Sequence, residues 1–267
     1  MLKVLVFSKD RPLQLQAYLE SMFALGGVYT PSVSVILPDK TDYEPLIERY
    51  EDIDWVFESE HGGGFDLTLR EYTSEVLDDD DFVLFGCDDV VFTRPFNVNF
   101  APAFLTQEKN VLGFSLRLGH NIQPGIPVQD LGILMYWRWP GMPSHWGYPF
   151  ELMASVYRAS LLKEILDNTK DQIQCPNHLE SFGVTHVMRT KAESHPYMSM
   201  FRSASSAVAQ DVNRVQHHFQ NRYNGDNFQD AEYLKTLYKQ GKRLEWGNLF
   251  GIEPPDCFVG NRYWKVL

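Results

Sequence analysis

The residues of this sequence best suited to chemistry are two adjacent carboxylates, Asp88 and Asp89, which interrupt an apolar segment. They follow the run Phe82–Cys87 and precede Val90–Phe92, so a buried strand is predicted to end at the pair. Two carboxylates at the end of a core strand are costly unless a partner compensates their charge. A hard divalent cation, Mg²⁺ or Mn²⁺, that also holds a diphosphate would be such a partner. The alternative is a pair that only makes hydrogen bonds in a turn.

The elements that must position this pair can be predicted from the first ninety residues, where two hydrophobic periods alternate. The predicted strands are Leu2–Phe7, 33–37, 55–57 and Phe82–Cys87. The predicted helices begin near Arg11 with Pro12 in the first turn, at a cap formed by Thr41 or Asp42, and after the glycines at 62–64. This order predicts an α/β fold with a Rossmann-like, mostly parallel sheet and helices on both faces.

Polar residues follow three of these strands. They are Ser8 to Arg11 after the first strand, Asp39 after the second, and the acidic pair after the fourth. Ligands of such sheets bind beyond the carboxyl ends of the strands, so these side chains are expected to share one site.

The second half is less regular. Strands are predicted at 111–118, 133–139, 153–157 and 207–215, and helices after residue 158, from Pro176 to His186, and from a cap at Asn227. We expect a single domain over 1–267, in which about 1–92 binds a nucleotide and about 93–267 builds the second substrate site.

The composition narrows the possible partners. A formal net charge of -11 makes nucleic acid an unlikely ligand, although Arg11, Arg70 and Arg117 could form a local pocket for a phosphorylated small molecule. The three cysteines form no CxxC pair, which suits a reducing compartment. No stretch approaches the roughly 18 apolar residues of a membrane span, so a cytoplasmic location is expected, with peripheral membrane association left open.

Several segments together resemble bacterial GT-A glycosyltransferases. The strand that runs into an acidic pair is similar to the DxD region of that family, and VFSKDRPLQLQAYLESM at 6–22 resembles its first strand and helix. Similar segments follow in the same order: SLRLGHNI at 115–122, WGYPFELMASVYR at 146–158, CPNHLE at 175–180 and VNRVQ at 212–216. The resemblance implies a GT-A fold and transfer of a sugar from a nucleoside-diphosphate donor, with uridine as the guessed base, to a glycan or lipid-linked acceptor.

The resemblance also implies roles for single residues. Phe7, Ser8 and Arg11 would lie beside the base and phosphates, and Asp39 near the base or ribose. Asp88 would contact the ribose or a metal-bound water, and Asp89 would ligate Mn²⁺ or Mg²⁺. The donor diphosphate or sugar would be approached by Arg117 and Asn121, with Arg70 as a further phosphate contact.

The remaining implied roles are those of the base and of a late metal ligand. An inverting enzyme needs a carboxylate to take the proton of the acceptor hydroxyl, and Glu180 is the first candidate, with Glu151 second. His217 would complete the metal shell. Two positions depart from the pattern: Cys87 stands where the first acid of a DxD is expected, and the residues around Met153 to Ser155 lack the Asp and His of similar sequences. This leaves two alternatives open: a non-catalytic module that binds nucleotide-sugars, and a sugar nucleotidyltransferase on the same fold.

Overall fold

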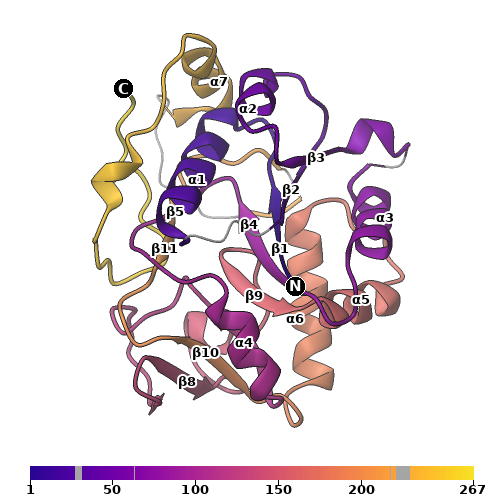
Figure 1. The fold of residues 1–267 in the computed structure, drawn as a ribbon, viewed down its shortest axis with the longest axis vertical. Helices are drawn as coiled ribbons and strands as arrows, with labels where there is room; N and C mark the ends of the chain where they lie inside the picture. The colour runs from indigo at the N-terminus through magenta and orange to yellow at the C-terminus, as the bar shows by residue number, and fades with distance from the viewer. Residues whose placement is uncertain (28–31, 63, 217, 221–228) are drawn as a thin grey trace.

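The computed structural model describes residues 1–27, 32–62, 64–216, 218–220 and 229–267 of the chain. Within these residues one large sheet has the strand order β3-β2-β1-β4-β9-β6-β10-β8-β7 (Figure 1). Its strands are β1 (Leu2–Phe7), β2 (Ser32–Leu37), β3 (Asp54–Phe57), β4 (Phe82–Cys87), β6 (Val111–Ser115), β7 (Gln129–Asp130), β8 (Leu134–Arg138), β9 (Ser155–Arg158) and β10 (Tyr197–Phe201). A small second sheet pairs β5 (Val90–Phe92) with β11 (Ala207–Ala209).

The large sheet is mostly parallel, as predicted. β1 runs parallel to β2 and β4, β2 to β3, and β6 to β10. β9 lies antiparallel between β4 and β6, and β8 lies antiparallel beside β10. Because β9 pairs with both β4 and β6, it joins the regular first half of the sheet to the second half.

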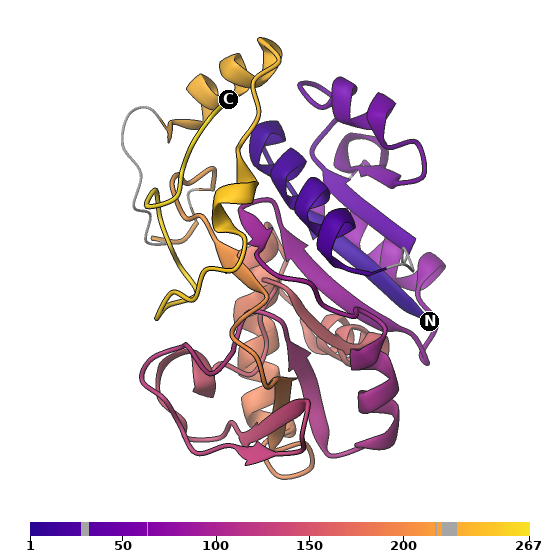
Figure 2. The same cartoon turned by 60° about the vertical axis from the view of Figure 1, so that its left-hand side comes forward.

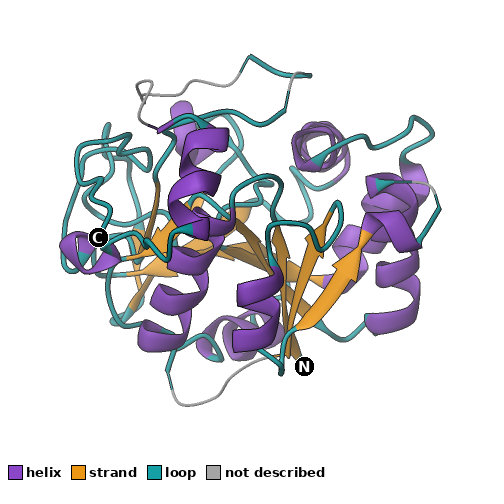
Figure 3. Ribbon diagram, turned by 90° about the horizontal axis from the view of Figure 1, so that it is seen from above, coloured by secondary structure: helices purple, strands orange, loops and turns teal. Residues whose placement is uncertain are grey.

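Helices cover both faces of this sheet, which confirms the predicted layering (Figures 2 and 3). Side chains alternate along each strand, so in β1 Val4 and Val6 face one core while Leu5 and Phe7 face the other. The first core is shared with α1 (Pro12–Leu25), α2 (Glu44–Arg49), α4 (Phe100–Gln107) and α7 (Ala231–Lys239). The second core is shared with α3 (Phe65–Val76), α5 (Ala159–Asn168) and α6 (Pro176–Thr190).

Several predicted boundaries were wrong. The strand predicted at 111–118 ends at Ser115, and the strand predicted at 207–215 ends at Ala209. Beyond these ends the amides bond outside the strands, Leu116 to the Ala154 carbonyl and Gln210 to the backbone carbonyl of Asp89. The second helix has Tyr43 as its N-cap rather than Thr41 or Asp42. The last helix is capped by Asp230, whose carboxylate accepts from two backbone amides; Asn227 lies outside the described residues.

The register of the sheet explains why one edge carries the polar residues. Phe7 of β1 pairs with Cys87 of β4, so the residues that follow each strand emerge side by side. β9 runs the other way, and its Ser155 pairs with Phe85. The residues just before β9 therefore reach the same edge as the residues just after β4. This reversal brings segment 151–154 to the acidic pair.

Candidate active site

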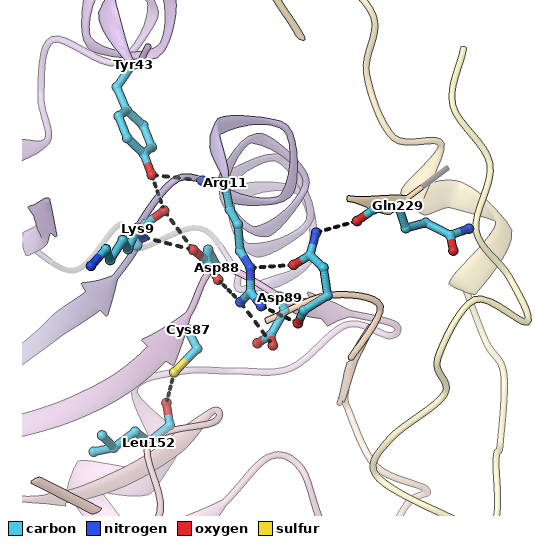
Figure 4. A network of polar contacts seen from close by, with 10 residues as sticks. Lys9, Arg11, Tyr43, Cys87, Asp88, Asp89, Leu152 and Gln229 are labelled. Carbon is cyan, nitrogen blue, oxygen red and sulfur yellow. Dashed lines mark hydrogen bonds and ion pairs between the residues drawn. The ribbon is translucent and has the colours of Figure 1, made fainter. Parts of the chain in front are cut away.

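Asp88 is the most constrained residue at this edge of the sheet. Its Oδ2 accepts from the Ser8 hydroxyl at 2.9 Å and from the Lys9 backbone amide at 3.2 Å, and its Oδ1 accepts from Nη1 of Arg11 at 2.9 Å (Figure 4). The residue is 4% exposed. Both oxygens are thus committed to the β1 loop, so Asp88 organises the site rather than offering a free ligand atom.

Arg11 is the hub of the network. Its Nη1 lies between the two carboxylates, 2.9 Å from Asp88 and 3.4 Å from Asp89. Its Nε donates to the side-chain oxygen of Asn213 at 2.7 Å, and its Nη2 donates to the Asn213 carbonyl at 2.6 Å (Figure 4). Burial lowers the pKa of Arg11, but Asp88 and Asp89 outweigh it and the pKa is raised. The guanidinium is therefore a fixed part of the site.

Asp89 is the more accessible of the pair, with its side chain 21% exposed. Burial raises its pKa to about 6; Arg11 opposes this rise, and the neighbouring charges of Asp88 and Asp211 add to it. Three carboxylates thus act on a region that Arg11 only partly neutralises. A divalent cation fits this excess of negative charge.

A second charged cluster lies beside the first and joins the segment after β6 to the segment before β9. Arg117 and Glu151 are both buried, with Nε and Oε2 3.5 Å apart. Glu151 also accepts from the backbone amide of Met153 at 2.6 Å and from the hydroxyl of Ser155. Burial raises the pKa of Glu151, although Arg117 and these hydrogen bonds oppose the rise. Because its oxygens are engaged, Glu151 serves this cluster as a structural anion.

Glu180 lies near the start of α6 and faces both clusters. Burial raises its pKa to about 8, with Glu151 adding to the rise and Arg117 opposing it; Asp89 contributes a further, smaller rise. The side chain remains partly exposed. A carboxylate whose pKa lies near neutrality and that solvent can reach has the properties of a general base.

Cys87 lies between the acidic pair and this second cluster. Its thiol approaches the Leu152 carbonyl at 3.6 Å (Figure 4). Burial raises the pKa of Cys87, and the charges of Asp89, Asp88 and Glu180 raise it further. The position of the first DxD acid is thus held by a neutral thiol, and the acidic function falls on the two residues after it.

A third group of potential ligands lies behind Arg117. Among the described residues, donor atoms of His145, Asp256 and Cys257 lie within 4.8 Å of one another. Nδ1 of His145 is 3.3 Å from Nη1 of Arg117, however, and Nε2 is 3.1 Å from Asp256. A cation there would meet one carboxylate, Asp256, beside a guanidinium, whereas Asp88, Asp89 and Asp211 set three carboxylates against Arg11. Asp89 is therefore the better candidate for a metal ligand.

Two residues that were predicted to contact the donor, Asp39 and Arg70, make local structural contacts. Asp39 is exposed after β2, and its carboxylate accepts from the backbone amide of Thr41 at 2.7 Å. Arg70, on α3, pairs with Asp66 at 3.0 Å and donates to carbonyls at the end of α5. The guanidinium of Arg70 therefore ties two helices together, and we do not assign it to the donor.

The three other predicted residues are Phe7, Asn121 and His217. Phe7 is 4% exposed and packs against Phe65, with ring centroids 5.4 Å apart. Asn121 donates to the Pro254 carbonyl at 2.6 Å and accepts from the Ser205 amide at 2.8 Å, so it braces a loop. His217 lies outside the described residues.

The sequence reading missed Asn213, which lies 202 positions from Arg11 in the chain. Its segment, VNRVQ at 212–216, resembles a segment of the family and was predicted to lie in a strand, but neither observation assigned a role to Asn213. It also missed Tyr43 as a site residue, because an aromatic on a helix face reads as core. The Tyr43 hydroxyl is 2.9 Å from Oγ of Ser8 and accepts from the Arg11 amide at 3.1 Å.

Comparison with known proteins identifies a related enzyme and a shared fold. No protein-family model matches the chain. The bifunctional glycosyltransferase pgtA of Dictyostelium discoideum is 24% identical over 260 residues, an alignment that covers 82% of this chain and 33% of pgtA. The chain thus spans about a third of the length of this curated relative.

A solved structure shows the same fold. The crystal structure of S. aureus TarS 1-349 in complex with UDP-GlcNAc matches with a TM-score of 0.51 and 17% identity, over 83% of this chain and 61% of that one. A bacterial origin of the chain remains a prediction. The chain is therefore similar in sequence to a known glycosyltransferase and has the GT-A type of fold, which confirms the resemblance predicted from its motifs.

Proposed function

We propose that this chain is a glycosyltransferase that takes a sugar from a nucleoside-diphosphate donor with the help of Mn²⁺ or Mg²⁺. The observation that carries the proposal is the acidic pair, Asp88 and Asp89, at the carboxyl end of β4, where Arg11 fixes one carboxylate and leaves the other partly exposed. The similarity to pgtA and the fold shared with a UDP-GlcNAc complex support it. Uridine is the base we propose.

The donor side of the site would depend on Asp89. It would ligate the cation, and substrate phosphates would supply further ligands, as is usual for Mg²⁺. When bound, the cation neutralises charge on the departing diphosphate. Asp88 and Arg11 hold the β1 loop and the end of β4 in register, so that Asp89 keeps its direction.

The acceptor side would depend on Glu180. Its raised pKa makes it a stronger base than an ordinary glutamate, and we propose that it takes the proton of the acceptor hydroxyl. Arg117 and Glu151 fix the segment before β9 beside it. We propose a glycan or lipid-linked acceptor and a cytoplasmic location. No helix in the described part of the chain is both long and apolar enough to cross a membrane.

A second candidate function is a module that binds nucleotide-sugars without turnover. Two observations favour it: Cys87 replaces an expected acid, and Arg11 already neutralises part of the pair. It predicts binding of the donor with neither hydrolysis nor transfer.

Isothermal titration and thermal shift with UDP and UDP-GlcNAc, each with and without Mn²⁺, test the proposal. For the wild type we expect binding that requires Mn²⁺, and at 100 times Kd a stabilisation of about 2.7 kcal/mol, which is several degrees. Asp89→Asn keeps the size of the side chain and should abolish the response. Asp79→Asn removes an exposed carboxylate that pairs with Lys163 elsewhere, and it should respond as the wild type does.

Three other results would be informative. Binding without any release of UDP from UDP-GlcNAc, on a wide acceptor panel, would favour the non-catalytic module. Binding that ignores Mn²⁺ would remove the metal from the proposal but leave the donor. If neither nucleotide binds under any condition, while a panel of other nucleotide-sugars also fails, the proposal is wrong.

A further inference from the structure

Asn213 holds Arg11 from the side opposite the acidic pair. It comes from the segment after β11 and offers Arg11 two acceptors, its side-chain oxygen at 2.7 Å and its backbone carbonyl at 2.6 Å. Its own amide donates to the Gln229 carbonyl at 2.7 Å, which fixes the orientation of the side chain (Figure 4). Both sides of the Arg11 guanidinium are therefore in contact, one with anions and one with a neutral amide.

The geometry shows what this second contact does. A guanidinium is a rigid planar fork, so fixing Nε and Nη2 also fixes the direction of Nη1. In that direction Nη1 makes a close contact with Asp88 at 2.9 Å and a long one with Asp89 at 3.4 Å. Asn213 thus turns the strong donors of Arg11 away from Asp89.

Without Asn213, the Nε donor would lose its acceptor while it still lies beside a region of excess negative charge. The carboxylate within reach is Asp89, whose Oδ2 already lies 3.4 Å from Nη1 of Arg11, whereas both oxygens of Asp88 are engaged. Arginine and carboxylate readily form a two-point contact. Such a pair would occupy the oxygens that a cation requires.

We propose that Asn213 is a positioning residue that keeps Arg11 from pairing fully with Asp89, and that it thereby sets the affinity of Asp89 for a divalent cation. This inference rests on the proposed function in one respect, namely that Asp89 is a metal ligand. Asn213 would act on the cation through Arg11.

The test is a titration of the whole chain with Mn²⁺ alone, in which electron paramagnetic resonance reports the free aqueous ion. Asn213→Ala should weaken Mn²⁺ binding about 10- to 100-fold, the range found when a residue that orients a ligand is lost. Asn213→Asp keeps an acceptor for Arg11 but loses the donor to Gln229, so it should bind Mn²⁺ at least as tightly as the wild type. Asn168→Ala removes an exposed amide from α5 and is the matched control.

A double variant distinguishes an effect of Asn213 on the position of Arg11 from a general loss of structure. If Asn213 acts through Arg11, then Asn213→Ala combined with Arg11→Ala should bind Mn²⁺ no more weakly than Arg11→Ala alone. The thermal midpoint of each variant shows whether the fold is retained. If Asn213→Ala does not fold, the Mn²⁺ affinity of Asn213→Asp tests the inference.

The outcomes distinguish this inference from the proposed function. If the wild type binds Mn²⁺ and Asp89→Asn does not, but Asn213→Ala binds as the wild type does, the inference is wrong and the metal site stands. A drop in affinity that Asn213→Asp shares with Asn213→Ala would also overturn it, because the Arg11 contact could not then be the cause. Wild type that binds no Mn²⁺ would overturn the inference together with the metal part of the proposed function.

Discussion

Glu180 and Glu151 are two neighbouring glutamates with opposite surroundings. The oxygens of Glu151 are held by Met153, Ser155 and Arg117, so its charge is compensated inside the fold. Glu180 has less compensation, and its pKa is raised to about 8. From sequence alone they differ only in their predicted elements, whereas in the structure they differ in their hydrogen bonds.

Replacement of Glu180 should therefore separate activity from stability. Glu180→Gln should lower kcat about 10²- to 10⁴-fold, the usual contribution of a general base. The folded state keeps the proton of Glu180 up to about pH 8, while an unfolded glutamate loses it near pH 4.3, so stability falls as pH rises between these values. Glutamine cannot ionise, and the variant should be the more stable protein above pH 8.

Steady-state kinetics with an identified acceptor and thermal melts from pH 5 to 9 check both parts. Glu151→Gln is the matched control: it removes the partner of a buried arginine and should destabilise the fold by about 3 kcal/mol in urea titrations. A Glu180→Gln enzyme with full kcat would exclude Glu180 as the base. A variant that is less stable at every pH would show that contacts of the Glu180 carboxyl group support the fold.

At the residue scale, the sequence could predict the acids and the basic residues near them, but not their connections. Asp88 and Asp89 were visible because charge is rare at the end of an apolar strand. Arg11 was predicted to lie beside the donor phosphates, which stays a prediction; its contacts with Asp88 and Asn213 were not predicted. That arrangement depends on a residue from the far end of the chain, which no local pattern encodes.

At the scale of elements, the contact of β4 with α1 depends on Gly86. A methyl group at this position would lie 2.2 Å from the hydroxyl oxygen of Tyr18, which is fully buried and has no room to turn away. Gly86→Ala should therefore destabilise the fold by about 1–3 kcal/mol, the usual cost of overpacking. Because Gly86 lies just before the acidic pair, we also expect weaker Mn²⁺ binding.

Urea titration measures the first effect. Gly247→Ala is the comparison, since a methyl group there would meet nothing within 4 Å, and it should be close to neutral. If Gly86→Ala is as stable as Gly247→Ala, then α1 must be able to shift away from β4. The acidic pair, Asp88 and Asp89, would then be held less rigidly.

The elements of the first half followed from hydrophobic periodicity, and their order predicted the parallel sheet. β9 was recognised as a strand, but its place between β4 and β6 was not predictable, because pairing depends on contacts between segments about seventy positions apart. β10 and α4 were missed altogether. β10 is fully enclosed by β6 and β8, and its Met-rich sequence lacks the usual signals of a strand.

At the scale of the whole molecule, the predicted halves at about 1–92 and 93–267 share one sheet. β9, from the second half, pairs with β4, from the first, and α7 packs with the core that contains α1. Neither half has a complete core of its own. We therefore expect one cooperative unfolding transition rather than two.

Urea unfolding followed by two probes checks this expectation. Trp55 lies in the first half, and Trp137, Trp139, Trp146 and others lie in the second, so a Trp55→Phe variant reports fluorescence from the second half alone. Far-UV circular dichroism reports both halves. Coincident midpoints are expected, whereas a separate fluorescence transition would show two independently folding units.

The bond between Arg11 and Asn213 also has a consequence for how the protein is made. Synthesis delivers Arg11 and the acidic pair first, and Asn213 leaves the ribosome only after the segment between Asp89 and Asn213 has also been translated. At about 5–20 residues per second, this delay is on the order of ten seconds. During that interval the nascent chain contains β1 and β4 but not Asn213, which accepts two hydrogen bonds from Arg11. A ribosome-bound chain that stops before residue 213 would thus carry both acids without the arrangement that we propose for cation binding.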